Sequence, residues 1–136
     1  MSTCIFCKII EGEIPCSKVY EDVDVFAFLD IKPVNPGHVL VIPKKHYESI
    51  HDTPNDIFAK MSVVAKKIAT SVQDNLGAKG VNIGMNNGKT AGQVVFHAHI
   101  HVMPRYGKDS FQLWIGEESK TDERTKIAKA LQKALK

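Results

Sequence analysis

The sequence of 136 residues has no long apolar run, no strong excess of charge and few cysteines. A membrane-spanning helix needs about 18 or more apolar residues in a row, and no stretch approaches that length. The N-terminus also lacks the basic start and apolar run of a secretion signal. We therefore expect no membrane association and a location in the cytoplasm.

The charge balance of 18 Lys plus Arg against 15 Asp plus Glu gives a net charge of +3. A phosphate-backbone footprint usually needs a stronger, clustered basic excess, so we expect no nucleic-acid partner. A small anionic ligand is compatible with this balance.

Only three cysteines are present, and an odd number in a chain without a secretion signal argues against a disulfide framework. Cys4 and Cys7 form a Cys-x-x-Cys pair with the spacing of a zinc knuckle, and Cys16 is left over. A zinc site needs four ligands, so reduced thiols and metal ligands both stay open for the pair. The histidines available to complete a site are His46, His51 and His97.

Runs of β-branched and aromatic residues, bounded by prolines, glycines and acidic turns, predict five strands. The predicted strands are a hairpin within residues 18–30 and single strands over about 38–42, 80–87 and 94–104. Residues 88–93, "GKTAGQ", read as a flexible loop.

Two segments have helical periodicity. Thr53 can cap a helix with Pro54 at its first position, and Gly77 follows the last apolar residue, which predicts a helix over about 54–76. Apolar residues in the tail, from Ile127 to Leu135, predict a weaker amphipathic helix from about residue 121. This order of elements implies an α+β fold with a mainly antiparallel five-stranded sheet.

Three of the six histidines, His97, His99 and His101, occupy alternate positions within five residues. Because strand side chains alternate between faces, these histidines share one face, and the small and apolar residues between them share the other. Positions on one face of a strand are about 6.6 Å apart. A zinc ion with nitrogen ligands at about 2.0–2.1 Å can bridge one such gap, but three ligands from one strand strain the site. Chemistry by the imidazoles fits better, with one nucleophile and neighbours that donate to an anion.

The segment "HAHIHVM" resembles the signature of the histidine triad (HIT) hydrolases, which is His-x-His-x-His followed by two apolar residues. The resemblance runs to about Arg105 and includes "FCKIIEGEIP", "FAFLDIKPVNPGHVLVIPKKH" and "GMNNGKTAGQVVFHAHIHVMPR" in the family's order. It implies one HIT domain over 1–136, with a core of about 4–106 and a C-terminal extension over 107–136. His101 stands where the nucleotidylyltransferase branch has glutamine, which favours hydrolysis.

The N-terminal "IFCKII" and the short length resemble the nucleoside phosphoramidase branch of the family. The resemblance implies cleavage of purine nucleoside 5′-phosphoramidates and related nucleotidyl conjugates at the α-phosphorus, through a covalent nucleotidyl-histidine intermediate. Two alternatives stay open: hydrolysis of dinucleoside polyphosphates, and a nucleotide-binding interaction module with weak hydrolysis.

By motif position, His99 matches the nucleophile, and His101 matches a phosphate donor that could also protonate the leaving group. His38 matches the family's fourth histidine near the triad, whose first member is His97. The positions that match the nucleotide site are Phe6, Ile9, Phe28, Leu29, Asp30, Ile31, Asn86, Gly92, Gln93 and Val94.

Within this nucleotide set, Asp30 matches the carboxylate that accepts from the ribose hydroxyls, and the apolar residues from Phe6 to Ile31 match the base pocket. Asn86 and Gln93 match polar contacts to the phosphate or the leaving group. The loop glycines let backbone N–H groups approach a phosphate. Val94 departs from the Ser or Thr that the family often has, so a hydroxyl contact is missing there.

Some bacterial members with "CxFC" at the start bind a structural zinc through both cysteines, the histidine after "PKK" and the first triad histidine. The resemblance therefore implies Cys4, Cys7, His46 and His97 as zinc ligands, with no organic cofactor. The family is typically a homodimer, and Trp114 with the tail helix are candidates for contact with the partner.

Overall fold

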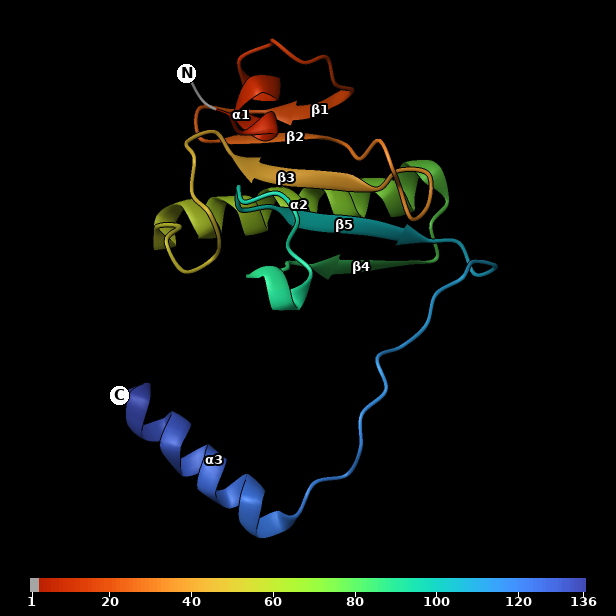
Figure 1. Ribbon diagram of the computed structural model, residues 1–136. Coiled ribbons are helices and arrows are strands. Elements are labelled where there is room, and N and C mark those ends of the chain that lie inside the picture. The colour runs from red at the N-terminus through yellow and green to blue at the C-terminus, as the bar shows by residue number, and fades with distance from the viewer. Residues whose placement is uncertain (1–2) are drawn as a thin grey trace.

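The computed structural model describes residues 3–136 and contains one five-stranded sheet in the order β1-β2-β3-β5-β4. Every neighbouring pair of strands is antiparallel, and Figure 1 shows the strands stacked in this order. The strands are β1 (Lys18–Glu21), β2 (Val25–Leu29), β3 (Val39–Pro43), β4 (Gly80–Gly84) and β5 (Ile100–Arg105). The helices are α1 (Ile5–Ile10), α2 (Asn55–Leu76), α3 (Thr121–Ala134) and the short 3-10 helix η1 (Lys89–Ala91). The predicted α+β class with an antiparallel sheet is confirmed.

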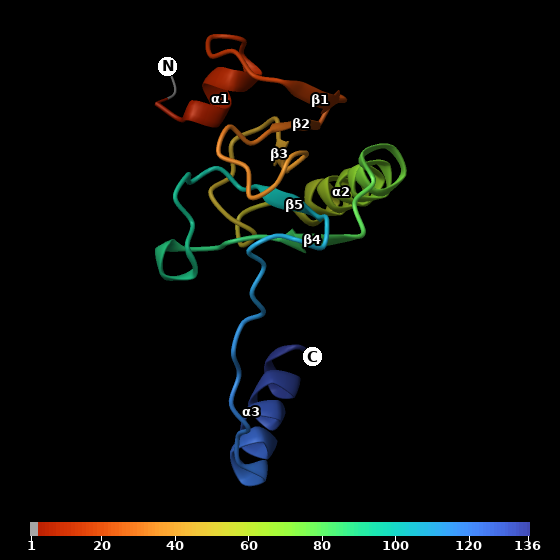
Figure 2. The same ribbon diagram turned by 90° about the vertical axis from the view of Figure 1, so that its right-hand side faces the viewer.

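The sheet separates two apolar clusters, because side chains alternate along each strand. On one face, Val25, Val41 and Val102 pack with residues of α2 such as Met61. On the other face, Phe28 and its neighbours pack with residues of α1. Figure 2 shows α2 on one side of the sheet and η1 with its flanking loops on the other. The side away from α2 is the side on which the histidines lie.

Helix α2 begins at Asn55, one residue later than predicted, and Thr53 does not cap it. The hydroxyl of Thr53 instead donates to the carbonyl of Ser49 at 2.6 Å, which closes the turn before the helix. At the other end the prediction is confirmed. Gly77 has φ +74°, and its N–H donates to the carbonyl of Val72, as in a left-handed C-cap.

Strand β5 is shorter than predicted and begins at Ile100, so His97 and His99 precede it. Its partner β3 ends at Pro43, which has no N–H with which to continue the ladder. The chain before Ile100 pairs instead with the loop that follows β3, where the Ala98 N–H donates to the carbonyl of Tyr47 at 2.7 Å. The alternation of side chains nevertheless continues, since Ile100 packs in the cluster with α2, whereas the rings of His97 and His99 contact Phe6 of α1.

Helix α1 was not predicted, because its six residues are rich in β-branched and apolar side chains. A helix this short is marginal by itself. Burial of Phe6 and Ile9 against the sheet stabilises it, by roughly 1.5–3 kcal/mol for each side chain.

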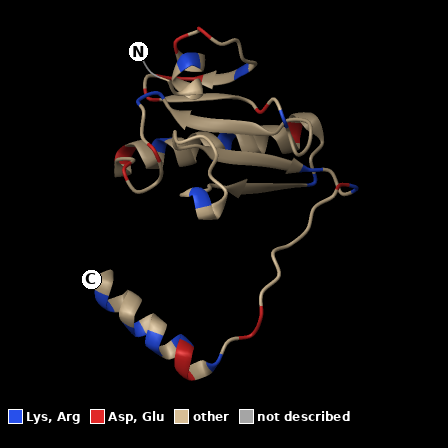
Figure 3. Ribbon diagram, in the orientation of Figure 1, with Lys and Arg blue, Asp and Glu red and all other residues tan. Residues whose placement is uncertain are grey.

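The predicted tail helix is confirmed as α3, but none of its residues is buried. A segment without helix or strand, residues 107–120, leads to it, and α3 lies apart from the sheet (Figure 1). Acidic residues mark its first turn and lysines follow along its length (Figure 3). Across residues 3–136, no helix is long and apolar enough to cross a membrane.

Candidate functional site

His99 lies at the centre of the site, directly before β5, and is almost fully buried. Its Nδ1 lies 2.7 Å from the carbonyl oxygen of His97. A carbonyl oxygen can only accept, so Nδ1 of His99 carries the proton. The other ring nitrogen, Nε2, therefore holds an unprotonated lone pair, which is the state that a nucleophilic imidazole needs.

His101 and His38 flank His99 on the same face of the sheet. The ring centroids of His99 and His101 are 5.0 Å apart, and Nε2 of His38 lies 3.0 Å from Nδ1 of His101. His101 pairs in register with Leu40, whose side chain belongs to the cluster under α1. An oxygen of Asp30 lies 3.7 Å from Nε2 of His38. The structure thus brings all three histidines and the predicted ribose carboxylate together.

Burial keeps these imidazoles neutral. Burial and, to a smaller extent, the neighbouring His99 and His38 together lower the pKa of His101 to about 4, although the charge of Asp30 raises it. Burial also lowers the pKa of His99, although its bond to the His97 carbonyl and the charge of Asp30 act in the opposite direction. Near neutral pH the site therefore presents neutral rings to an anionic ligand.

Phe6 from α1 packs over the histidines, on the same face of the sheet. Its ring meets those of His99 and Phe28 edge to face, with centroids 5.2 and 5.4 Å apart. Phe6, Ile9 and Phe28 are all buried, whereas Leu29 and Ile31 are exposed, Ile31 to 89%. Of the predicted base pocket, three members thus form one apolar wall beside His99, and two lie open to solvent.

Gln93 is buried and holds the loop that precedes the histidines. Its side-chain oxygen accepts from the Gly88 N–H at 2.9 Å, and its amide nitrogen donates to the carbonyls of Glu48 and Val95. Both ends of the amide are thus engaged with the backbone, so its contact with a phosphate stays a prediction. Within this loop, the side chain of Asn86 lies beside Gly92, whose φ is +93°. Val94 is 86% exposed.

A second cluster joins the N-terminus to the histidine segment. The sulfurs of Cys4 and Cys7 lie 3.5 and 3.6 Å from Nδ1 of His97. Nδ1 of His46 lies 3.4 Å from the sulfur of Cys7 and 3.2 Å from Nδ1 of His97. All four ligand atoms lie within 4.8 Å of one another. His51, the other histidine that was available from the sequence, is not a member.

The dimensions of this cluster fit a tetrahedral zinc ion. Zinc–nitrogen bonds of about 2.0–2.1 Å and zinc–sulfur bonds of about 2.3 Å place two nitrogens roughly 3.3–3.4 Å apart, and a nitrogen and a sulfur roughly 3.6 Å apart. The nitrogen–nitrogen separation of 3.2 Å and the nitrogen–sulfur separations of 3.4–3.6 Å match that geometry. Nε2 of His97 donates to the carbonyl of Pro43 at 2.8 Å, so its Nδ1 presents a lone pair to the cluster.

Two partners in the site could not be found from the sequence, because both are backbone groups. One is the carbonyl of Pro43, which fixes the ring of His97. The other is the N–H of Val34, which lies 3.1 Å from Nδ1 of His38. Neither requires a particular side chain, so no residue pattern identifies them.

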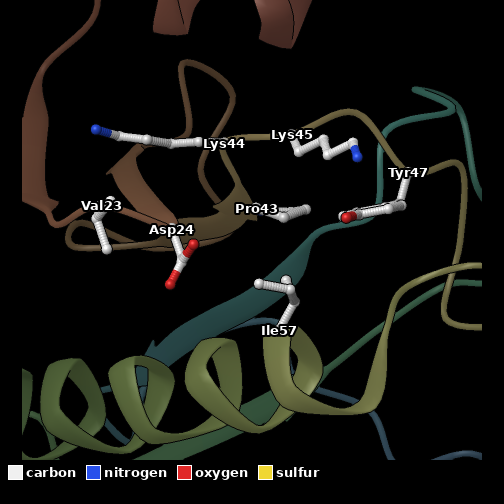
Figure 4. A pocket seen from close by; sticks show the side chains of 7 residues that line it. All are labelled: Val23, Asp24, Pro43, Lys44, Lys45, Tyr47 and Ile57. Atoms are coloured by element: carbon white, nitrogen blue, oxygen red, sulfur yellow. The ribbon is translucent and has the colours of Figure 1, made fainter.

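A cavity of about 320 Å³ lies elsewhere, at the N-terminal end of α2. Figure 4 shows Asp24, Pro43 and Ile57 around it, with the amine of Lys45 extended toward Tyr47. Its walls include no histidine. Pro43 and Ile57 belong to the side of the sheet that α2 covers, so this cavity is separate from the histidine site.

Comparison with known proteins matches most of the chain to one family. A family model described as HIT domain matches residues 11–108. An uncharacterized HIT-like protein of Methanocaldococcus jannaschii is 50% identical over 119 residues, which cover 88% of this chain and 92% of that protein. A protein of Arabidopsis thaliana named adenylylsulfatase HINT3 is 44% identical over 114 residues, which cover 84% of this chain and 57% of that protein.

Solved structures agree with the fold. A protein of Streptococcus mutans has a TM-score of 0.93 at 43% identity, and the match covers 100% of this chain and 87% of that one. A histidine triad nucleotide-binding protein of Candida albicans has a TM-score of 0.87 at 36% identity, with 98% and 97% covered. A zinc-bound histidine triad family protein of Mycobacterium smegmatis has a TM-score of 0.78 at 38% identity, with 98% of both chains covered.

Proposed function

Because the chain belongs to the HIT family, we propose that it hydrolyses purine nucleoside 5′-phosphoramidates and related nucleotidyl conjugates at the α-phosphorus. The observation that carries this proposal is the hydrogen bond from His99 Nδ1 to the carbonyl of His97, because it leaves Nε2 as a nucleophile. The relatives named as a nucleotide-binding protein and an adenylylsulfatase support a nucleotidyl substrate.

The reaction has two steps. Nε2 of His99 attacks the α-phosphorus and forms a nitrogen–phosphorus bond, while the bond from phosphorus to the leaving nitrogen breaks. The leaving amine departs with the bonding pair and takes a proton from water. A water molecule then attacks the nucleotidyl-histidine, gives its hydroxyl to phosphorus, returns a proton to the solvent and frees His99. The products are the nucleoside monophosphate and the amine.

Neighbouring groups assist by binding the phosphate. The transition state spreads negative charge over phosphate oxygens and is stabilised chiefly by donors that are already in position. We assign that part to the Nε2 proton of His101, together with Asn86 and the loop backbone at Gly92. Asp30 would accept from the ribose hydroxyls, and the wall of Phe6, Ile9 and Phe28 would contact the base. Gln93 holds the loop through its backbone contacts.

A structural zinc ion belongs to the same proposal, held by Cys4, Cys7, His46 and His97. The zinc-bound relative of M. smegmatis and the tetrahedral spacing of the four ligand atoms support it. The ion would fix the ring of His97, whose carbonyl accepts from His99, and would thereby stabilise the nucleophile's position. No organic cofactor is needed, and a cytoplasmic location stays a prediction.

We also propose a homodimer, built on the core of about 4–106 and the extension over 107–136. Strand β4 is at the edge of the sheet, and Ile83 on it is 53% exposed. Ile83 lines an apolar hollow of about 350 Å³ together with Phe58 and Met85. The extension adds exposed apolar side chains, including Trp114 at 99% exposure. A second copy of the chain would cover both surfaces.

Brief exposure to adenosine 5′-phosphoramidate, followed by mass spectrometry, tests the chemistry. We expect an adenylyl-sized adduct on His99 in the wild-type protein and none in His99→Ala, with loss of turnover in that variant. An adduct on another residue, or undiminished turnover in His99→Ala, contradicts the proposal. His51→Ala is the matched control, since His51 is an exposed histidine outside both clusters.

A substrate panel separates the alternatives. Adenosine 5′-phosphoramidate, adenylyl sulfate and a diadenosine polyphosphate are compared by kcat/KM at one enzyme concentration. Preference for the phosphoramidate supports the proposal, and preference for the polyphosphate favours the dinucleoside alternative. Weak turnover of all three with tight nucleotide binding favours the interaction module.

A further inference from the structure

We propose that His38 is a positioning residue that holds His101 in the tautomer with its proton on Nε2, and that the backbone N–H of Val34 dictates this arrangement. The inference rests on the proposed function, in which that proton of His101 faces the phosphate. It assigns a role to a backbone group and a loop that have no direct contact with the reacting atoms.

The direction of the hydrogen bonds follows from the one group whose role is fixed. A backbone N–H can only donate, so Nδ1 of His38, 3.1 Å from the N–H of Val34, must accept. A neutral imidazole that accepts at Nδ1 carries its proton on Nε2. That proton is therefore donated to Nδ1 of His101, 3.0 Å away. Since Nδ1 of His101 accepts, the proton of His101 lies on Nε2.

Both rings must be neutral for this chain of bonds, and their surroundings favour the neutral form. His38 is only 3% exposed, and burial lowers its pKa, as does the charge of Arg105, while Asp30 raises it. Burial and the two neighbouring histidines lower the pKa of His101 to about 4. A neutral His101 carries one ring proton, and the hydrogen bond from His38 determines which of its two nitrogens carries that proton.

The loop that presents the Val34 N–H is held at both ends. Within the loop, the N–H of Asp30 donates to the carbonyl of His38 at 2.9 Å. The side-chain amide of Asn35 donates to the carbonyl of Pro104 at 2.9 Å, on the same strand as His101. Gly37 has φ +90° and packs its backbone closely against Pro104. The loop that carries the Val34 N–H is therefore anchored to β5, the strand that carries His101. This keeps His38 aligned between the Val34 N–H and His101.

A metal ion at Asp30, His38 and His101 is the competing explanation, because their ligand atoms also lie within 4.8 Å of one another. A metal would need a lone pair on Nε2 of His38, and the proton would then have to sit on Nδ1. That proton would face the N–H of Val34, and two donors cannot share a hydrogen bond. The contact with Val34 therefore favours the hydrogen-bonded chain over a metal.

Nitrogen-15 NMR of histidine-labelled full-length protein tests the assignment without any substrate. Protonated and unprotonated ring nitrogens have well-separated chemical shifts, so each tautomer can be read directly. At neutral pH we expect unprotonated Nδ1 and protonated Nε2 in both His38 and His101. A wild-type His101 with its proton on Nδ1, or a mixture of tautomers, overturns the proposal.

Substitutions at His38 link the tautomer to catalysis. In His38→Leu, which removes the donor, we expect mixed tautomers in His101 and a loss of kcat of roughly 10–100-fold with little change in KM. In His38→Gln the amide N–H can still donate to His101, so the single tautomer and most of the turnover should return. If His38→Leu is folded and keeps the single Nε2–H tautomer, His38 does not set it.

Val34→Pro removes the N–H, and Val34→Ala keeps the N–H and controls for loss of the valine side chain. We expect mixed tautomers in His38 and His101 of the proline variant alone, with folding of both checked by thermal unfolding. Should both variants keep the wild-type tautomers, Val34 has no part in the chain. Absence of turnover in every protein, with the expected tautomers, would count against the proposed reaction and leave this inference intact.

Discussion

The imidazole of His99 donates from Nδ1 to the backbone carbonyl of His97 across 2.7 Å. His97 is also the buried member of the cluster with Cys4, Cys7 and His46. One peptide segment therefore serves two sites, because the side chain of His97 faces the sulfurs and its carbonyl faces the nucleophile. Any change that lets the ring of His97 move should therefore also disturb the hydrogen bond that positions His99.

Loss of the cysteines should therefore remove zinc and weaken catalysis together. For Cys4→Ser/Cys7→Ser we expect no bound zinc, a lower melting temperature and a kcat reduced by roughly 10–100-fold, since supporting ligands of a site typically contribute that much. Metal analysis, thermal unfolding and turnover measure the three effects. Cys16→Ser is the control, because Cys16 packs against the small apolar cluster and is not a member of the site. A double variant that retains zinc would refute the ligand assignment.

Gly37 directly precedes His38, and we expect it not to tolerate a side chain. Its φ is +90°, and a Cβ there would lie 2.7 Å from Cδ1 of Leu76 and 3.3 Å from Cγ of Pro104. Leu76 can move, but the ring of Pro104 is held in β5. We expect Gly37→Ala to lower the free energy of unfolding by about 1–3 kcal/mol and to reduce turnover, measured by urea denaturation and kcat.

Gly12→Ala is the matched control for Gly37→Ala. Gly12 has φ +80° with nothing within 4 Å of an added Cβ, so it reports backbone strain without crowding. Equal loss of stability and turnover in the two variants would show that the approach to Pro104 does not matter.

Much of the fold was predictable because the sheet and α2 follow regular apolar patterns. The strands near residues 18–30, 38–42 and 80–87 and the long helix were placed within a few residues of their observed bounds. Helix α1 was missed because tertiary packing of Phe6 and Ile9, rather than its own sequence, stabilises it. Strand β5 was predicted too long because the effect of Pro43 acts through the partner strand.

The side chains of the candidate site were predictable, whereas the backbone partners of His38 and His97 were not. The triad histidines and the Cys-x-x-Cys pair were identified by residue type and spacing. His38 and His46 were identified by the resemblance to the HIT family, and the structure brings these residues into two clusters. Gln93 was expected at a phosphate, yet its amide bonds to three backbone groups. The sequence could not show this, because one of its partners, the Glu48 carbonyl, is 45 residues away along the chain.

The exposed edge of the sheet should govern association. Ile83 on β4 lines the apolar hollow next to Phe58 and Met85. We expect Ile83→Asp to be monomeric and wild type to be dimeric in sedimentation experiments at the same concentration, because a charge in an apolar interface is costly. Val63→Asp is the control, since Val63 is equally exposed at 53% but does not line the hollow. A monomeric wild-type protein would rule the dimer out.

Val94 should influence the leaving group rather than stability. It is 86% exposed, and the family often has Ser or Thr at this position. Val94→Ser introduces a hydroxyl, whose hydrogen bond is typically worth about 0.5–1.5 kcal/mol, so we expect kcat/KM for the phosphoramidate to rise about 2- to 10-fold. Val94→Ala controls for loss of the valine side chain. An unchanged ratio of phosphoramidate to adenylyl sulfate turnover in Val94→Ser would show that residue 94 does not contact the leaving group.

The neutral histidines predict how stability and activity respond to acid. His101 faces His99, His38 and Asp30, and its pKa falls from 6.5 to about 4 because burial disfavours the charged ring. Between these two values the unfolded chain binds more protons than the folded one, so stability falls as pH drops from about 6.5 toward 4. We expect His101 to contribute roughly 1–3 kcal/mol of that loss. Activity should persist below pH 6.5, because the rings stay neutral there.

Urea denaturation at several pH values measures this contribution. His101→Gln cannot be protonated in this range, so its stability should fall less steeply than that of wild type between about pH 6.5 and 4. The kcat/KM of wild type over the same range reports the free enzyme's ionisations, and its acid limb should lie below pH 6.5. Parallel stability curves for the two proteins would mean that His101 is as easily protonated in the folded state as in the unfolded chain.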